Sequence, residues 1–173
     1  MRTRNSMPTY FYTHPAYRKL SSDARSLLLY LNTNSYTNLL GCYYLPLHII
    51  KEELQWDNEK ALNMLAELMV QELSTYDAQQ EWVWVSHFLL WNPLHNECHG
   101  KGLAKCFRLV PSQVSFYQDL VHYLEQTQIH LTPDFVDELS ALQDKPPHSS
   151  KHKQAQMLKL LKKAFEHASA LCL

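Results

Sequence analysis

Hydrophobic residues recur three or four positions apart in three successive runs, the spacing that buries one face of a helix. Ser21 and Ser22 are good capping residues and precede the first run, which predicts a helix ending near Asn32. The second run starts at Pro46, a residue favoured in the first turn of a helix. The third follows a cap at Asp57 or Asn58. Its apolar face comprises Leu62, Leu65, Leu68, Met69 and Leu73.

Extended segments interrupt and follow these helices. Cys42–Leu45 is a short strand before the second helix, and Ser74–Tyr76 and Trp82–Val85 form a hairpin across the polar loop Asp77–Glu81. This order, a helix, a strand, two helices and a two-stranded wing, is that of a winged helix-turn-helix. We therefore predict a mainly α fold with a small β-hairpin, in which the third helix is the recognition helix and additional C-terminal helices follow.

The second half of the chain reads as mostly helical. Asn92 and Pro93 turn the chain after the hairpin, and Leu103–Leu109 is a short helix or an extended piece. Ser112 is expected to cap a helix that ends near Gln126, and Thr132 to open another that ends near Gln143. The predicted organisation is a basic and aromatic arm (1–16), a winged-helix domain (17–111), a helical extension (112–144), a linker (145–153) and an amphipathic helix (154–173). The apolar face of that last helix could pair with a second copy or cover its own chain.

Composition limits the possible classes of protein. A hydrophobic content of 46% is enough for a core, and with three glycines a Gly-built phosphate loop is nearly excluded. Apolar stretches such as Leu27–Leu31 are too short to cross a membrane, so we expect a cytoplasmic protein. The four cysteines lack paired spacing, which predicts reduced thiols rather than disulfides.

Charge is segregated along the chain although the formal net charge is only −1. Residues 1–30 carry five basic residues and one acidic residue, and residues 145–173 carry six and one. Residues 41–90 carry two basic and eight acidic residues, so the predicted winged helix is acidic and both ends are basic.

The segments LSSDARSLLLYLNTNSYTNLLGCYYLPLHIIKEELQW, ALNMLAELMVQELSTYD and EWVWVSHFLLWNPLHNECHGKGLAKCFRLVP carry a family resemblance. Over about residues 17–111 the chain resembles the N-terminal winged-helix domain of phage replication initiation and helicase-loader-type proteins. The shared pattern is a Gly-aromatic-Leu-Pro step, a tryptophan-rich wing, and an Asn-Pro followed by Lys-Gly-Leu. The resemblance implies a role in DNA replication, although the helix equivalent to the DNA reader is acidic here.

The recognition helix has two interpretations. Its expected solvent face is Glu59, Lys60, Asn63, Glu67 and Gln71. Asparagine can read adenine, but base reading follows phosphate anchoring by lysine or arginine, and this face has one cation. The alternative is a protein-facing acidic surface. Its candidate residues are Glu52, Glu53, Glu59, Glu67, Gln71, Asp77 and Glu81.

Nucleic-acid contact is predicted for the basic material, which is interleaved with Tyr10, Tyr12 and Tyr17 near the N-terminus. The candidate residues are Arg2, Arg4, Arg18, Lys19, Arg25, Lys60, Asn63, Lys101, Lys105, Arg108, Lys159, Lys162 and Lys163. The alternative is a solvated arm together with a C-terminal helix that packs or dimerises.

Catalytic chemistry finds no support in the sequence. No nucleophile-and-base signature is present, and we expect neither an enzyme nor a cofactor. His95, Cys98, His99 and Cys106 are potential zinc ligands, but their spacing fits no common zinc finger. Trp82, Trp84 and Trp91 could stack on bases if exposed, and we expect them in the core instead.

The sequence therefore predicts a non-catalytic winged-helix protein of phage or mobile-element type that binds DNA, a replication protein or both, without a membrane and with a possible homodimer. The alternative is a winged helix used as an adaptor or inhibitor, whose acidic face occupies a basic, nucleic-acid-binding groove on a partner.

Overall fold

The structure, a computed structural model, describes residues 5–7, 9–13, 15–127 and 130–142. Its elements in chain order are α1 (Pro15–Arg18), α2 (Ser22–Thr33), β1 (Cys42–Tyr44), α3 (Leu47–Leu54), α4 (Asn58–Val70), β2 (Ser74–Asp77), β3 (Trp82–Val85), α5 (Phe88–Trp91), α6 (Glu97–Phe107), α7 (Tyr117–Thr127) and α8 (Pro133–Ala141). The predicted linker, the last amphipathic helix and the first four residues of the arm lie outside the described residues. Within the described part, no helix has the length and apolar character needed to cross a bilayer.

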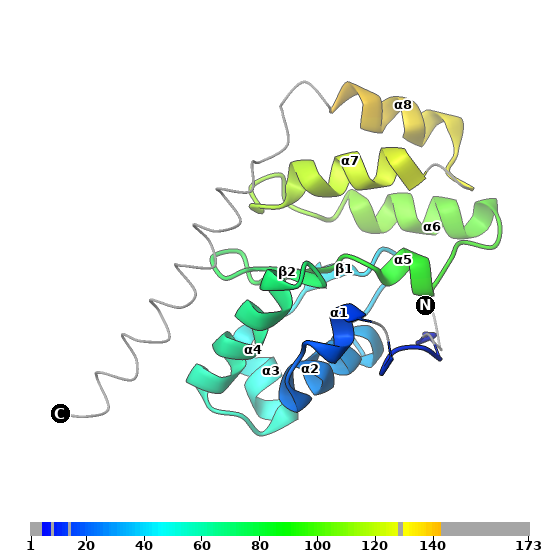
Figure 1. Cartoon of the computed structure of the whole chain (residues 1–173). Coiled ribbons are helices and arrows are strands. Elements are labelled where there is room, and N and C mark those ends of the chain that lie inside the picture. The colour runs from blue at the N-terminus through cyan, green and yellow to red at the C-terminus, as the bar shows by residue number, and fades with distance from the viewer. Residues whose placement is uncertain (1–4, 8, 14, 128–129, 143–173) are drawn as a thin grey trace.

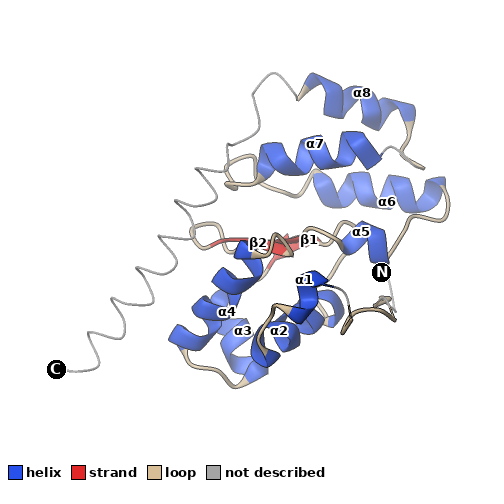
Figure 2. Ribbon diagram, viewed as in Figure 1, coloured by secondary structure: helices blue, strands red, loops and turns tan. Residues whose placement is uncertain are grey.

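Three layers make up the fold (Figure 1). A three-stranded antiparallel sheet, with strand order β1-β3-β2, lies between a layer of α1–α4 and a layer of α6–α8. Figure 2 shows the short strands between the two helical layers. The succession α2-β1-α3-α4-β2-β3, with β3 in the centre of the sheet, is the topology of a winged helix-turn-helix. The predicted mainly α fold with a small hairpin is therefore confirmed.

Side chains alternate along each strand, and the sheet buries residues on both of its faces. Val83 and Val85 point toward the α2–α4 layer, where the hydroxyl of the neighbouring Tyr43 approaches the Leu31 carbonyl of α2. Trp84 points the opposite way, with ring centroids 6.0 Å from Phe116 and 5.5 Å from Tyr123 of α7.

The tryptophans therefore serve mainly as core residues. Trp84 and Trp91 are both 6% exposed, as the sequence predicted. Trp82, on the same face of β3 as Trp84, is only partly buried and lies beside Tyr44. A base-stacking surface formed by Trp84 and Trp91 is excluded, because both rings are covered.

Predicted helix caps explain where α2 and α4 begin. Ser21 Oγ accepts a hydrogen bond of 3.1 Å from the Ala24 backbone N–H, and Asp57 Oδ1 accepts one of 2.7 Å from the Lys60 N–H. Each bond satisfies a backbone donor that the first helical turn leaves unpaired.

The C-terminal layer differs from the prediction in two places. Glu97–Phe107 forms one continuous helix, α6, whereas the sequence predicted a short helix or an extended piece over Leu103–Leu109. Ser112 does not cap α7, which begins five positions later at Tyr117, because turns closed by Val114 N–H to Pro111 O and Tyr117 N–H to Val114 O occupy the intervening segment.

Candidate interaction surfaces

The helix-turn-helix of α3 and α4 is joined by a tight turn. Gln55 ends α3 in the left-handed conformation, at φ 55°, and the Trp56 N–H bonds to the Lys51 carbonyl at 2.9 Å. Asp57 then caps α4. Because so few residues separate the helices, the end of α3 and the start of α4 present their polar side chains together.

Four of these side chains are exposed carboxylates, which we call the acidic face: Glu52, Glu53, Asp57 and Glu59. Beside them is a hollow of about 290 Å³ lined by Asp23, Asp57, Glu59, Lys60, Asn63 and Met64. The sequence predicted Asp57 as a helix cap and did not indicate that Asp23 or Asp57 lines this surface. No sequence signal identified the approach of Asp23 to α4, because it depends on tertiary packing.

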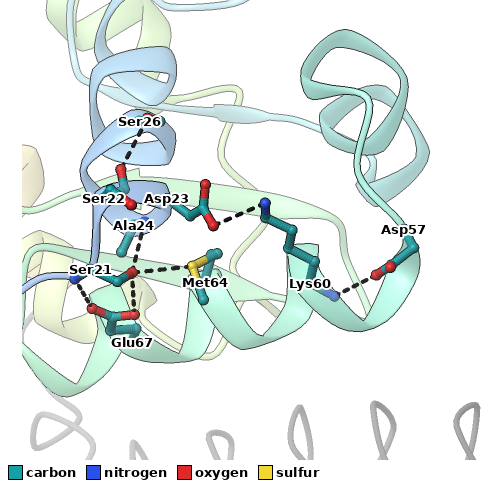
Figure 3. A network of polar contacts seen from close by, with 9 residues as sticks. All are labelled: Ser21, Ser22, Asp23, Ala24, Ser26, Asp57, Lys60, Met64 and Glu67. Atoms are coloured by element: carbon teal, nitrogen blue, oxygen red, sulfur yellow. Dashed lines mark hydrogen bonds and ion pairs between the residues drawn. The ribbon is translucent and has the colours of Figure 1, made fainter.

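Lys60, the one cation within α4, is already paired (Figure 3). Its Nζ lies 2.9 Å from Asp23 Oδ2 of α2 and 4.9 Å from the centroid of the Trp56 ring. Ion pairing and a cation–π contact both hold the ammonium group at the protein surface. A DNA phosphate would have to compete with the Asp23 carboxylate for this ammonium group.

Glu67, about two turns further along α4 than Lys60, contacts the start of α2. Its Oε1 accepts a 2.6 Å hydrogen bond from the Ser21 backbone N–H, and its Oε2 accepts one of 2.8 Å from the Ser21 hydroxyl (Figure 3). The same hydroxyl lies 3.5 Å from Met64 Sδ. The prediction that Glu67 belongs to a free solvent face is therefore wrong, because α2 occupies this side of α4.

Of the other residues expected on the recognition face, Glu59 is exposed, whereas Asn63 and Gln71 are partly buried. The face available to a partner is narrower than the sequence predicted and is dominated by carboxylates.

Replacing Glu67 with alanine should lower the free energy of unfolding by about 1 kcal/mol, because two hydrogen bonds to Ser21 are lost. Urea denaturation followed by far-UV circular dichroism measures this change. Glu59→Ala is the matched control on the same helix, with an expected cost of a few tenths of a kcal/mol from its favourable position near the helix N-terminus. Equal effects of the two substitutions would show that the Ser21 contact contributes nothing.

The structure also corrects the prediction for Asp77 of the wing. Asp77 was predicted on the protein-interaction surface, but it is 4% exposed. Its Oδ1 accepts from the Gln79 and Gln80 N–H groups, at 2.9 and 3.0 Å, and its Oδ2 accepts from Ser115 N–H at 2.8 Å. Asp77 therefore closes the hairpin loop and ties it to the segment before α7. Glu81 accepts a 3.1 Å hydrogen bond from the Tyr44 hydroxyl and is partly buried.

The basic residues predicted to contact nucleic acid differ in their exposure and in their contacts within the protein. Arg18, Lys19, Lys101 and Lys105 are exposed. Arg25 is used internally, since its guanidinium donates to the Tyr17 and Arg18 carbonyls at 3.1 and 3.2 Å and so caps the end of α1. The candidates that lie outside the described residues are Arg2, Arg4, Lys159, Lys162 and Lys163.

Arg108 joins α6 to α8. Its Nη2 lies 2.6 Å from Glu138 Oε2, its Nε also donates to that carboxylate at 3.1 Å, and its guanidinium lies 5.9 Å from the Phe135 ring centroid. Hydrogen bonding to Glu138 raises the pKa of Arg108. These contacts give Arg108 a structural partner, in contrast to its predicted role at nucleic acid.

The potential zinc ligands do not converge. His95 and His99 have ring centroids 5.8 Å apart near the start of α6, with Cys98 exposed beside them. Cys106 lies two turns further along, where burial raises the pKa of its thiol and disfavours the thiolate that zinc binds. Among the described residues, no three histidine, cysteine, aspartate or glutamate side chains are placed to share a metal ion.

No family model, curated protein or solved structure matches the chain. The class of protein therefore rests on the winged helix-turn-helix topology, and the choice of partner on the surfaces just described.

Proposed function

We propose that this chain is a non-catalytic winged-helix protein of the phage replication-initiation or helicase-loader type, and that its helix-turn-helix binds a basic protein surface rather than the major groove. The resemblance over residues 17–111 supports the replication setting. The topology supports a binding module, since helix-turn-helix folds act by placing one helix against a partner.

The pairing of Lys60 with Asp23 carries the choice of partner. A helix in the major groove lies among phosphates, and DNA carries one charge per about 1.7 Å of its axis. The segment 47–71 carries five acidic and two basic residues. With Lys60 paired to Asp23, the start of α4 offers no unpaired lysine or arginine for the phosphate anchoring that accompanies base reading.

A partner rich in lysine and arginine complements this surface. The carboxylates of the acidic face are exposed, so they would speed association with such a partner and make it sensitive to salt. A nucleic-acid-binding groove on a replication protein has this chemistry. Occupying that groove would let the chain recruit the partner or block its access to DNA.

The expected result is that Lys60→Ala with Asn63→Ala leaves the affinity of the full chain for duplex DNA unchanged, because α4 does not read bases. Anisotropy titrations of labelled duplex across a salt series measure this. A base-reading α4 would instead lose about tenfold in affinity for each contact removed, and that result would overturn the proposal.

The acidic face has its own test. Glu52→Lys, Glu53→Lys and Glu59→Lys together should abolish binding to the replication protein identified by cross-linking in the host complex. Asp134→Lys with Asp137→Lys, at exposed acidic positions of α8, is the control and should bind as the unmodified chain does. Equal losses in both variants would show that charge in general, and not this face, governs the complex.

A further inference from the structure

A short turn before α1 displays two tyrosines on the surface. Tyr10 is 45% exposed and Tyr12 is 61% exposed, whereas Phe11 between them is 3% exposed. The Thr13 N–H and hydroxyl both donate to the Tyr10 carbonyl, at 3.0 and 3.1 Å, and close the turn. Because Phe11 points inward, its two neighbours in the chain are held outward.

Aromatic contacts connect this turn to the core. Phe11 stacks on Tyr17, with centroids 4.9 Å apart and an interplanar angle of 27°, and Tyr17 meets Trp91 of α5 edge-on at 5.7 Å. Tyr12 stands edge-on to Phe11 at 5.2 Å. Tyr17 is 1% exposed, and burial raises its pKa to about 12, so it belongs to the support and not to the surface. The turn that bears the two exposed rings is therefore anchored to the core through Phe11, Tyr17 and Trp91.

The sequence on both sides of the turn carries charge of one sign. Residues 1–22 contain four basic residues and no acidic residue. Arg18 and Lys19 are exposed at the end of α1, which the Arg25 guanidinium fixes through two carbonyls. Three residues of chain and one helical turn separate Tyr12 from Arg18, so their Cα atoms are no more than about 15 Å apart.

We propose that Tyr10 and Tyr12 form a stacking platform for the bases of single-stranded nucleic acid, with Arg18 and Lys19 contacting its phosphates. Unpaired bases offer aromatic faces, whereas in a duplex those faces are stacked on each other. Exposed rings held on a turn, in a segment of the sequence that also carries exposed cations, suit that ligand better than a protein surface. The inference is independent of the acidic face, since it uses neither α3 nor α4.

The test uses the full chain and three fluorescein-labelled probes: a 20-nucleotide oligothymidylate, the matching oligouridylate and a 20-base-pair duplex. Tyr10→Ala with Tyr12→Ala should weaken binding to both single strands at least about tenfold and leave duplex binding unchanged, because stacking on two bases is lost. Tyr12→Phe keeps the aromatic face and should retain affinity. Tyr36→Ala, at a tyrosine 41% exposed elsewhere on the surface, should have no effect.

Arg18→Ala with Lys19→Ala should reduce the slope of log affinity against log salt for oligothymidylate by about 1.4, since each phosphate contact contributes about 0.7. Absence of single-strand binding at low salt, an equal loss in Tyr36→Ala, or full affinity in the double tyrosine variant would each overturn the proposal. Circular dichroism of every variant confirms that the fold is retained. None of these outcomes depends on the acidic-face variants, so the two proposals can fail separately.

Discussion

Trp84→Ala should lower the free energy of unfolding by about 3–5 kcal/mol, the largest effect we expect from a single substitution in this chain. The indole lies on the central strand, and its ring packs against Phe116 and Tyr123 across the boundary between the sheet and α7. Removing it leaves a cavity between the sheet and the C-terminal helical layer. Urea denaturation followed by far-UV circular dichroism measures the change without relying on tryptophan fluorescence.

Trp82→Ala is the matched control, at the same face of the same strand. Trp82 is only partly buried, so its loss should cost about 1 kcal/mol, in proportion to the smaller apolar area removed from water. Similar costs for the two substitutions would contradict the placement of α7 over Trp84.

Gly100→Ala is expected to destabilise the fold by about 1–3 kcal/mol, despite alanine being the better helix former by about 1 kcal/mol. A Cβ at position 100 would lie 1.9 Å from the His130 backbone oxygen, in the chain segment that leads into α8. Backbone cannot turn aside as a side chain can, so α8 and its connection must move away from α6. The same urea measurement reports the cost.

Gly102→Ala provides the comparison within the same helix. A Cβ there would meet only the Cδ1 of Leu39, at 2.5 Å, and that side chain can change rotamer. We expect Gly102→Ala to be neutral or to stabilise by up to about 1 kcal/mol. Destabilisation of equal size at both positions would show that neither close approach distinguishes them.

Local signals in the sequence were sufficient for the helix-turn-helix and the wing. Ser21 and Asp57 cap the helices they were expected to cap, and the hairpin strands lie within one residue of the predicted ones. Caps and alternating apolar residues act over a few positions, so they can be read without knowledge of the tertiary structure.

Long-range contacts decided the features that the sequence could not supply. The helix Glu97–Phe107 begins earlier than the segment Leu103–Leu109 that the sequence indicated, and the His130 backbone oxygen approaches this helix at Gly100. The sequence indicated a solvent-facing Glu67, because its hydrogen-bond partner Ser21 is 46 positions away in the chain. The sequence indicated a surface carboxylate at Asp77, because Ser115, whose N–H donates to it, is 38 positions away in the chain. Each interpretation failed where tertiary packing outweighed a local preference.

The sheet face that bears Trp84 and is covered by the C-terminal helical layer affects how the chain is synthesised. Trp84 leaves the ribosome before Phe116 and Tyr123, the residues that cover it. At about 5–20 residues per second, translation from Trp84 to Tyr123 takes roughly 2–8 s. During that interval the nascent winged helix exposes an aromatic strand surface, so a chaperone acting on this chain has its clearest target on the face that the finished protein hides.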